Sequence, residues 1–84
     1  MTPGDCREVM DDLKARKTGR TFDELRRILE SAGGRMHARS GGSHRVFSKP
    51  GCAQAPTLKE TRGEVLQAYV RAVIRALEEW CEDE

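Results

Sequence analysis

The sequence has few of the residues that mark specialised classes of protein. Only 5% of its 84 residues are aromatic, and no apolar run approaches the roughly 20 residues of a membrane-spanning helix. The N-terminus is too polar for a secretory signal. Cys6, Cys52 and Cys81 are odd in number and widely spaced, so they predict neither a disulfide framework nor a Cys-x-x-Cys metal pair. We therefore expect a cytoplasmic chain that makes no membrane contact.

The length of the chain also limits what it can build. Eighty-four residues can fill one core, so we expect a single domain over 1–84. With so few aromatic side chains, that core must be small and mostly aliphatic. A domain of this size is marginally stable, and a partner that covers one of its faces would add to its stability.

Charge is abundant but unevenly distributed. Charged residues make up 35% of the chain and nearly cancel, to a net charge of +1. Residues 31–63 carry six Lys and Arg against Glu60 alone, a balance of +5, whereas residues 64–84 have a balance of −4. A basic middle between neutral or acidic helices is typical of a site for a polyanion. The alternative is a solvated charged surface that binds no ligand.

Two helices are expected in the first part of the chain. The first, over 5–18, begins with Asp5 as its cap and ends before Gly19. The second begins at a capping box formed by Thr21 and Glu24 and ends at Gly33-Gly34. Each has an apolar stripe at helical spacing: Cys6, Val9, Met10 and Leu13 in the first, and Phe22, Leu25, Ile28, Leu29 and Ala32 in the second.

The pattern then changes from helical to alternating, which predicts strands over 35–39, 44–49 and 55–59. The glycine-rich run 40–43 predicts a tight hairpin connection, and Pro56 places the third strand at an edge. A final helix from Val65 has the longest apolar stripe: Leu66, Tyr69, Val70, Val73, Ile74, Leu77, Trp80 and Cys81. The order α-α-β-β-β-α predicts an α+β fold, with helices on one face of a three-stranded antiparallel sheet.

The residues that could carry chemistry lie around the predicted hairpin. The chain has no phosphate-loop signature, no Gly-x-Ser-x-Gly and no His-Glu-x-x-His, and its two histidines are too few for a zinc site. In Gly42-Ser43-His44, a glycine turn would let backbone amides approach a phosphate and a histidine could move protons near neutral pH. Arg39, Arg45 and Lys49 would supply positive charge for RNA. On spacing alone, this short motif also fits a plain hairpin turn with a surface histidine.

Several segments of the chain resemble the HicA family of bacterial toxins, and especially its longer members, which have an extra N-terminal helix. The resemblance extends from about Val9 to Glu79 and consists of the runs 20–25, 42–50, 62–63 and 67–71, which read RTFDEL, GSHRVFSKP, RG and QAYVR. It implies a double-stranded-RNA-binding-like fold, an mRNA-cleaving activity and a HicB-like antitoxin partner that covers the active face. The family's catalytic histidine is the one in Gly-Ser-His, here His44.

The chain departs from the family's pattern at two places. Arg45 follows His44 where many members have a second histidine, and the third strand lacks the Pro-Arg-His ending of the shorter members. The identity of a second acid or base stays open; His37, predicted on a strand face with Arg35 and Arg39, is either that group or an exposed strand residue. Tyr69 and Trp80 are either core residues or stacking platforms for bases.

Three functions are therefore considered. The first is a metal-independent ribonuclease toxin that needs no cofactor and is neutralised by a protein antitoxin. The second is an RNA-binding module that uses the same basic sheet without catalysis. The third is an interaction domain whose basic face binds an acidic protein.

Overall fold

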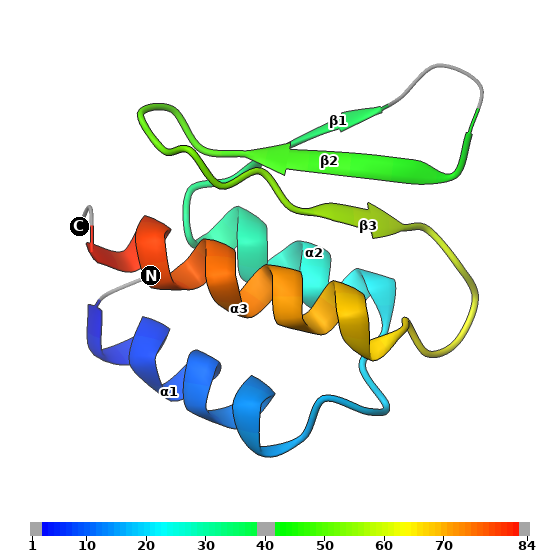
Figure 1. Ribbon diagram of the computed structural model, residues 1–84, viewed down its shortest axis with the longest axis horizontal. Helices are drawn as coiled ribbons and strands as arrows, with labels where there is room; N and C mark the ends of the chain where they lie inside the picture. The colour runs from blue at the N-terminus through cyan, green and yellow to red at the C-terminus, as the bar shows by residue number, and fades with distance from the viewer. Residues whose placement is uncertain (1–2, 39–41, 83–84) are drawn as a thin grey trace.

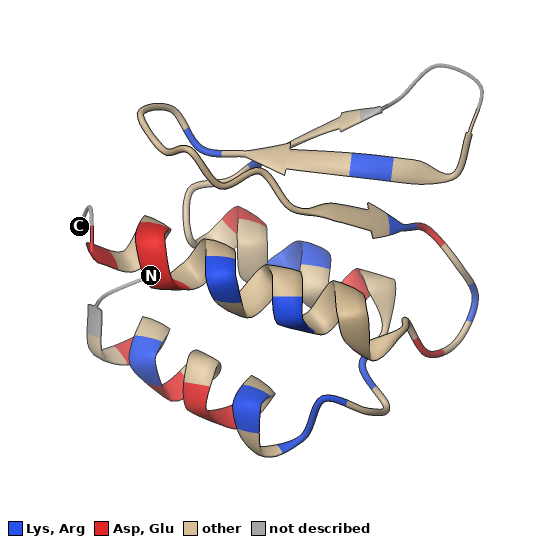
Figure 2. Cartoon of the chain, in the orientation of Figure 1, with Lys and Arg blue, Asp and Glu red and all other residues tan. Residues whose placement is uncertain are grey.

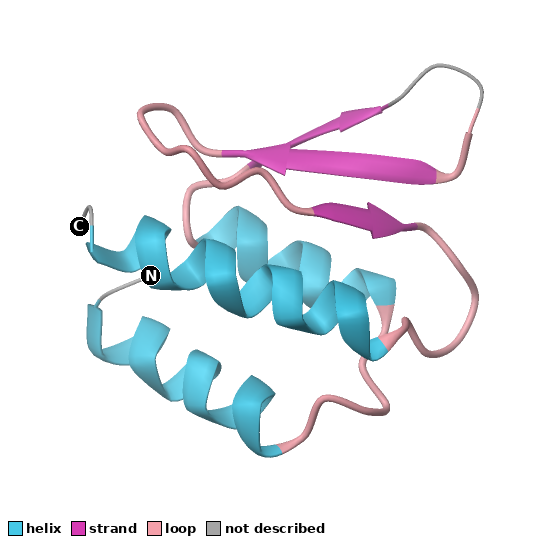
Figure 3. Cartoon of the chain, in the orientation of Figure 1, coloured by secondary structure: helices cyan, strands magenta, loops and turns pink. Residues whose placement is uncertain are grey.

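A computed structural model describes residues 3–38 and 42–82 and has the α+β architecture that the sequence predicts. Three helices and three strands follow one another in the predicted order (Figure 1, Figure 3). They are α1 (Pro3–Ala15), α2 (Phe22–Ser31), β1 (Arg35–Ala38), β2 (His44–Ser48), β3 (Thr57–Lys59) and α3 (Gln67–Glu82). Within these described residues, no helix combines the length and the apolar character needed to cross a membrane.

The strands form one antiparallel sheet in the order β1-β2-β3, which confirms that β3 lies at an edge. The register pairs Met36 with Phe47 and Arg45 with Leu58. Because directly paired residues of antiparallel strands point to the same side, these four side chains share the face that the helices cover. Phe47 and Leu58 are fully buried there.

Two helices cover that face, and the third lies behind them. α2 and α3 pack against the sheet, whereas α1 packs along the side of α3 that faces away from it (Figure 1). The sequence therefore predicted correctly that helices occupy one side of the sheet, but α1 extends the core in a further layer. The largest fully buried apolar side chains are Trp80, Phe47, Leu13, Leu25, Leu29, Leu58 and Leu77.

Several boundaries differ from the predicted ones. α1 begins at Pro3, before Asp5, because proline suits the first turn of a helix, and it ends at Ala15. β2 ends at Ser48, so that Lys49 lies beyond the strand. β3 begins at Thr57, although the carbonyl of Pro56 already accepts a hydrogen bond of 2.9 Å from the Phe47 amide.

Both ends of α2 follow the sequence. The Thr21 hydroxyl accepts a hydrogen bond of 3.2 Å from the Glu24 amide, as the predicted capping box requires. At the other end, Gly33 has a φ of 99°, which favours glycine. Gly34 allows a close approach, since a Cβ at this position would lie 2.5 Å from the Trp80 ring. The pair of glycines thus turns the chain into β1 directly against the core.

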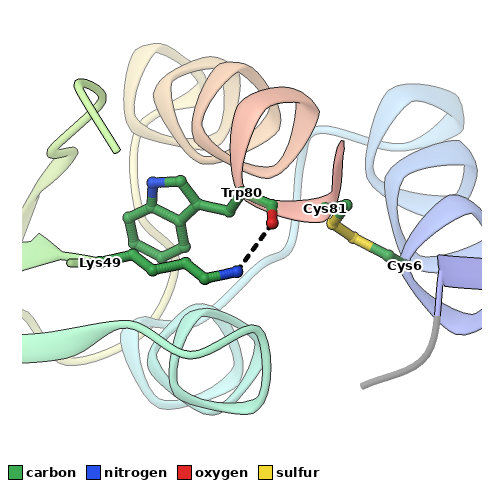
Figure 4. Close-up of a disulfide and its surroundings, with 4 residues drawn as sticks. All are labelled: Cys6, Lys49, Trp80 and Cys81. Carbon is green, nitrogen blue, oxygen red and sulfur yellow. Dashed lines mark hydrogen bonds between the residues drawn. A yellow bond between two sulfur atoms is a disulfide. The ribbon is translucent and has the colours of Figure 1, made fainter. Parts of the chain in front are cut away.

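A disulfide joins Cys6 of α1 to Cys81 of α3, two cysteines whose spacing predicted no disulfide framework (Figure 4). The two residues are 75 positions apart, and their Cα atoms are 6.2 Å apart, within the range that a disulfide spans. Spacing along the chain could not reveal this pair, because the helix packing brings it together. Cys52, in the loop after β2, lies outside this bond.

Arg20 is a buried charged residue that the sequence did not single out. It is 1% exposed, and its guanidinium donates hydrogen bonds to the carbonyls of Asp12 and Arg16 and to the Glu24 carboxylate. Burial by itself lowers the pKa of Arg20, but the hydrogen bonds to Asp12 and Glu24 outweigh it and raise that pKa. The Arg20 Nη1 atom also lies 3.0 Å from the Asp12 carboxylate, and this side-chain contact lowers the pKa of Asp12. Arg20 therefore joins the end of α1 to the start of α2.

The loop after β2 is held against the end of α3. The Glu79 carboxylate accepts hydrogen bonds of 2.8 and 2.7 Å from the amides of Ala53 and Gln54, and these lower the pKa of Glu79. The Trp80 indole donates to the Gln54 carbonyl at 3.0 Å. The indole polar group is thereby satisfied, and Trp80 is a core residue and not a stacking platform for bases.

Candidate functional site

His44 is the first residue of β2 and lies exposed on the face of the sheet that no helix covers. Its direct cross-strand partner is Lys59, the last residue of β3. Lys59 is exposed as well, so an ammonium and an imidazole lie on neighbouring strands of one open surface. We call this surface the open face; its described members are Arg35, His37, His44, Val46, Ser48, Thr57 and Lys59.

His37 belongs to the same open face as His44. The sequence placed His37 on the face of Arg35 but could not say whether His44 shares that face. In the register His37 pairs directly with Val46, and Val46 lies on the same side of β2 as His44, so both histidines are on one face. The His37 Nε2 atom shares a hydrogen bond of 2.8 Å with the Ser48 hydroxyl. His37 is exposed, as the simpler of the two interpretations predicted.

The turn that precedes His44 is fastened to the loop that follows β3. The Glu60 amide donates a hydrogen bond of 2.7 Å to the Ser43 carbonyl, so the pairing of β2 with β3 continues by one more step. Gly42 and Ser43 form a bend immediately before His44. The predicted RNA-binding pair Gly42 and Ser43 therefore adjoins the open face; the first half of the predicted 40–43 turn lies outside the described residues.

Arg45 points to the opposite side of the sheet from His44. Its Nη1 atom donates to the carbonyls of Gly42 and His44, at 2.7 and 3.1 Å, and its Nη2 atom lies 3.0 Å from the Glu60 carboxylate. The side chain is 21% exposed. We call this set of contacts the Arg45 clasp, because it holds the bend at Gly42 against the loop after β3. The prediction that Arg45 contacts RNA stays a prediction.

Lys49 lies at the far end of β2 from His44. Its ammonium donates a hydrogen bond of 2.8 Å to the Trp80 carbonyl, at the C-terminal end of α3 (Figure 4). The structure therefore does not bring Lys49 together with His44. Arg39, the third predicted phosphate contact, lies outside the described residues.

The described strands are free of negative charge. No Asp or Glu lies in β1, β2 or β3, and the acidic residues are on the helices and in the loops (Figure 2). The open face thus presents Arg35 and Lys59 beside its two histidines, and a polyanion would meet no like charge on these strands. Lys59 was not among the predicted site residues; only the register with β2 reveals that it faces His44.

The site offers few ligands for a metal ion. Over residues 3–38 and 42–82, no three His, Cys, Asp or Glu side chains come together in a group that could hold one. Glu60, which follows β3, pairs with Arg45. No family model, no curated protein and no solved structure matches the chain. Its function is therefore argued from the residues of the open face and from the sequence motifs.

Proposed function

We propose that this chain is the toxin of a toxin-antitoxin system, an endoribonuclease that cleaves mRNA without a metal ion and uses His44 as its proton-transfer group. The observation that supports this most is the position of His44. It lies exposed at the start of a strand, directly after the bend at Gly42 and Ser43 and opposite Lys59, on a sheet face whose described strands carry no acid. This surface thus combines an imidazole, fixed positive charge and open access.

The chemistry needs no group beyond those of the RNA, the protein and water. In RNA cleavage without a metal, the ribose 2′-oxygen attacks the adjacent phosphorus and the bond from phosphorus to the 5′-oxygen of the next nucleotide breaks; the 2′-OH proton leaves, and the 5′-oxygen departs with a proton. His44 takes up the first proton or donates the second, and a water molecule exchanges the other. Lys59 stabilises the extra negative charge on the phosphorus oxygens in the transition state. Backbone amides at the Gly42 bend could add donors to the same oxygens.

The fold and the partner follow from the same proposal. After α1, the order α-β-β-β-α agrees with the double-stranded-RNA-binding-like fold that the HicA resemblance implies. A HicB-like antitoxin would cover the open face, and an acidic surface would complement Arg35 and Lys59. The place of action would be the cytoplasm, where mRNA is found.

The test is the cleavage of RNA by a His44→Ala variant. We expect the variant to fold, because His44 is exposed, and to lose about 10²- to 10⁴-fold in cleavage rate, together with its inhibition of growth on expression. Arg27→Ala, at an exposed position of α2, is the matched control and should cleave normally. Full cleavage by folded His44→Ala would overturn the catalytic assignment. Binding of RNA without cleavage by the unaltered protein would favour the RNA-binding module instead.

A further inference from the structure

A small hollow of about 230 Å³ lies where β3 ends and α3 begins. It is smaller than the pockets of roughly 300–1,000 Å³ that hold drug-sized ligands, so its occupant must be a small group or one part of a larger molecule. The residues that line it are Lys59, Thr61, Glu64, Val65, Leu66 and Tyr69.

The wall formed by the start of α3 is apolar and accessible. Leu66 is 69% exposed, and within the described part of the chain only one other large hydrophobic side chain, Met36, is classed as exposed. Tyr69, in the first turn of α3, lines the same hollow and is half-buried. Val65, which also lines it, is buried. The hollow therefore offers an aromatic ring and a leucine to an apolar, flat ligand.

The hollow is adjacent to the proposed catalytic centre. Lys59 lines it and is also the direct cross-strand partner of His44. The loop between Lys59 and Leu66 is fixed on both sides: the Glu60 amide donates a hydrogen bond to the Ser43 carbonyl, and the Val65 amide donates one of 2.8 Å to the Arg20 carbonyl. Because β3 is an edge strand, an RNA whose phosphate lies between His44 and Lys59 on the open face would reach this recess around the edge of the sheet.

We propose that this hollow binds one unpaired nucleobase of the RNA, next to the phosphate that His44 and Lys59 hold. The base would stack on Tyr69 and Leu66, and Thr61 and Glu64, which also line the hollow, would offer an oxygen acceptor each to its polar edge. A base within a duplex is not available for such stacking, so the substrate is single-stranded RNA. This inference rests on the proposed function and adds the substrate class and a specificity site to it.

The test compares RNA that carries bases with RNA that lacks them. Short single-stranded 2′-O-methyl RNA oligomers, in which the 2′-oxygen cannot attack, are titrated into the full chain, together with an abasic ribose-phosphate chain of equal length. We expect the unaltered protein to bind the base-bearing oligomers roughly 5- to 150-fold more tightly, the range that stacking of one base provides. Leu66→Ala and Tyr69→Leu should lose most of this difference.

Leu66→Ala removes only an exposed side chain, so its result stands even if Tyr69→Leu fails to fold. Met36→Ala is the matched control, because Met36 is exposed but lines a different hollow, beside α2, and it should keep the full difference.

Equal affinity for both ligands, or a difference that Leu66→Ala leaves intact, would overturn the base site while the proposed ribonuclease stands. Absence of binding to either ligand would overturn both. Unchanged RNA binding by Leu66→Ala, with loss of binding to the antitoxin, would make the hollow a protein interface and overturn the base site.

Discussion

The Lys49 ammonium donates a hydrogen bond of 2.8 Å to the backbone carbonyl of Trp80, 31 positions further along the chain. The carbonyls of the last helical turn have no partner within the helix, and the helix dipole makes this end negative. A lysine that reaches it therefore satisfies a polar group and complements a partial charge. The stem of Lys49 also lies against Gly33, where a Cβ would be 3.1 Å from its Cε atom. Lys49 thus connects the sheet to the ends of both α2 and α3.

A Lys49→Met variant should be less stable than the unaltered protein. Methionine keeps the apolar stem but removes the charged donor, and such a hydrogen bond contributes about 1–3 kcal/mol. Urea unfolding followed by Trp80 fluorescence measures the change in the free energy of unfolding. Lys59→Met is the matched control, because Lys59 is exposed on the open face; its stability should change by less than about 0.5 kcal/mol.

In RNA binding the same two variants should show the opposite pattern: Lys59→Met should be affected and Lys49→Met should not. If Lys59 contacts a phosphate, Lys59→Met weakens binding to all RNA sequences about equally and reduces the slope of log affinity against log salt by roughly one. Lys49→Met should leave the slope unchanged. A reduced slope for Lys49→Met, with Lys59→Met unaffected, would favour the sequence-based assignment of Lys49 to RNA and would contradict the face proposed here.

The Arg45 clasp should affect the rate of cleavage more than the binding of RNA. The Arg45 side chain bonds to the carbonyls of Gly42 and His44 from the helix-covered side of the sheet, so it positions His44 without reaching the open face. We expect Arg45→Met to lower kcat about tenfold or more with little change in KM, since a small displacement of a catalytic group is costly. Glu60→Gln, which weakens only the outer ion pair, should have a smaller effect of the same kind. A loss confined to KM would instead support the prediction that Arg45 contacts the phosphates.

Cleavage should proceed at an undiminished rate in excess EDTA. A catalytic magnesium ion is usually held by one or two carboxylates, and the described strands of the open face have none. Glu60 pairs with Arg45 on the other side of the sheet, so a magnesium ion that used Glu60 as a ligand would break the Arg45 clasp. Initial rates measured with EDTA and with added magnesium are compared. Activity that is lost in EDTA and restored by magnesium would count against the mechanism.

The sequence predicted the elements of this fold better than their contacts. Periodicity located three helices and three strands, because burial on one face imposes a local pattern such as the stripe from Val70 to Trp80. It could not set the register, and the register decides that Lys59 faces His44. Nor could it show which helices pack together. The Cys6–Cys81 bond and the burial of Arg20 depend on the position of α1 against its neighbours.

The disulfide between Cys6 and Cys81 should contribute to stability but not to catalysis. It closes a segment of 75 positions, and the loss of such a bond from a small domain typically costs about 2–5 kcal/mol, largely through the entropy of the unfolded chain. Urea unfolding with and without dithiothreitol should show this difference in the unaltered protein and in a Cys52→Ser control. In a Cys6→Ser variant, dithiothreitol should have no effect.

The rate of RNA cleavage by the folded, reduced protein should match that of the oxidised protein, because the bond joins α1 to α3 on the far side of the sheet from His44 (Figure 1). Equal unfolding midpoints in both conditions would contradict the contribution to stability. If the chain acts in the cytoplasm, as proposed, thiols are kept reduced there, and the size of the difference then measures the stability that the chain would lack in that compartment.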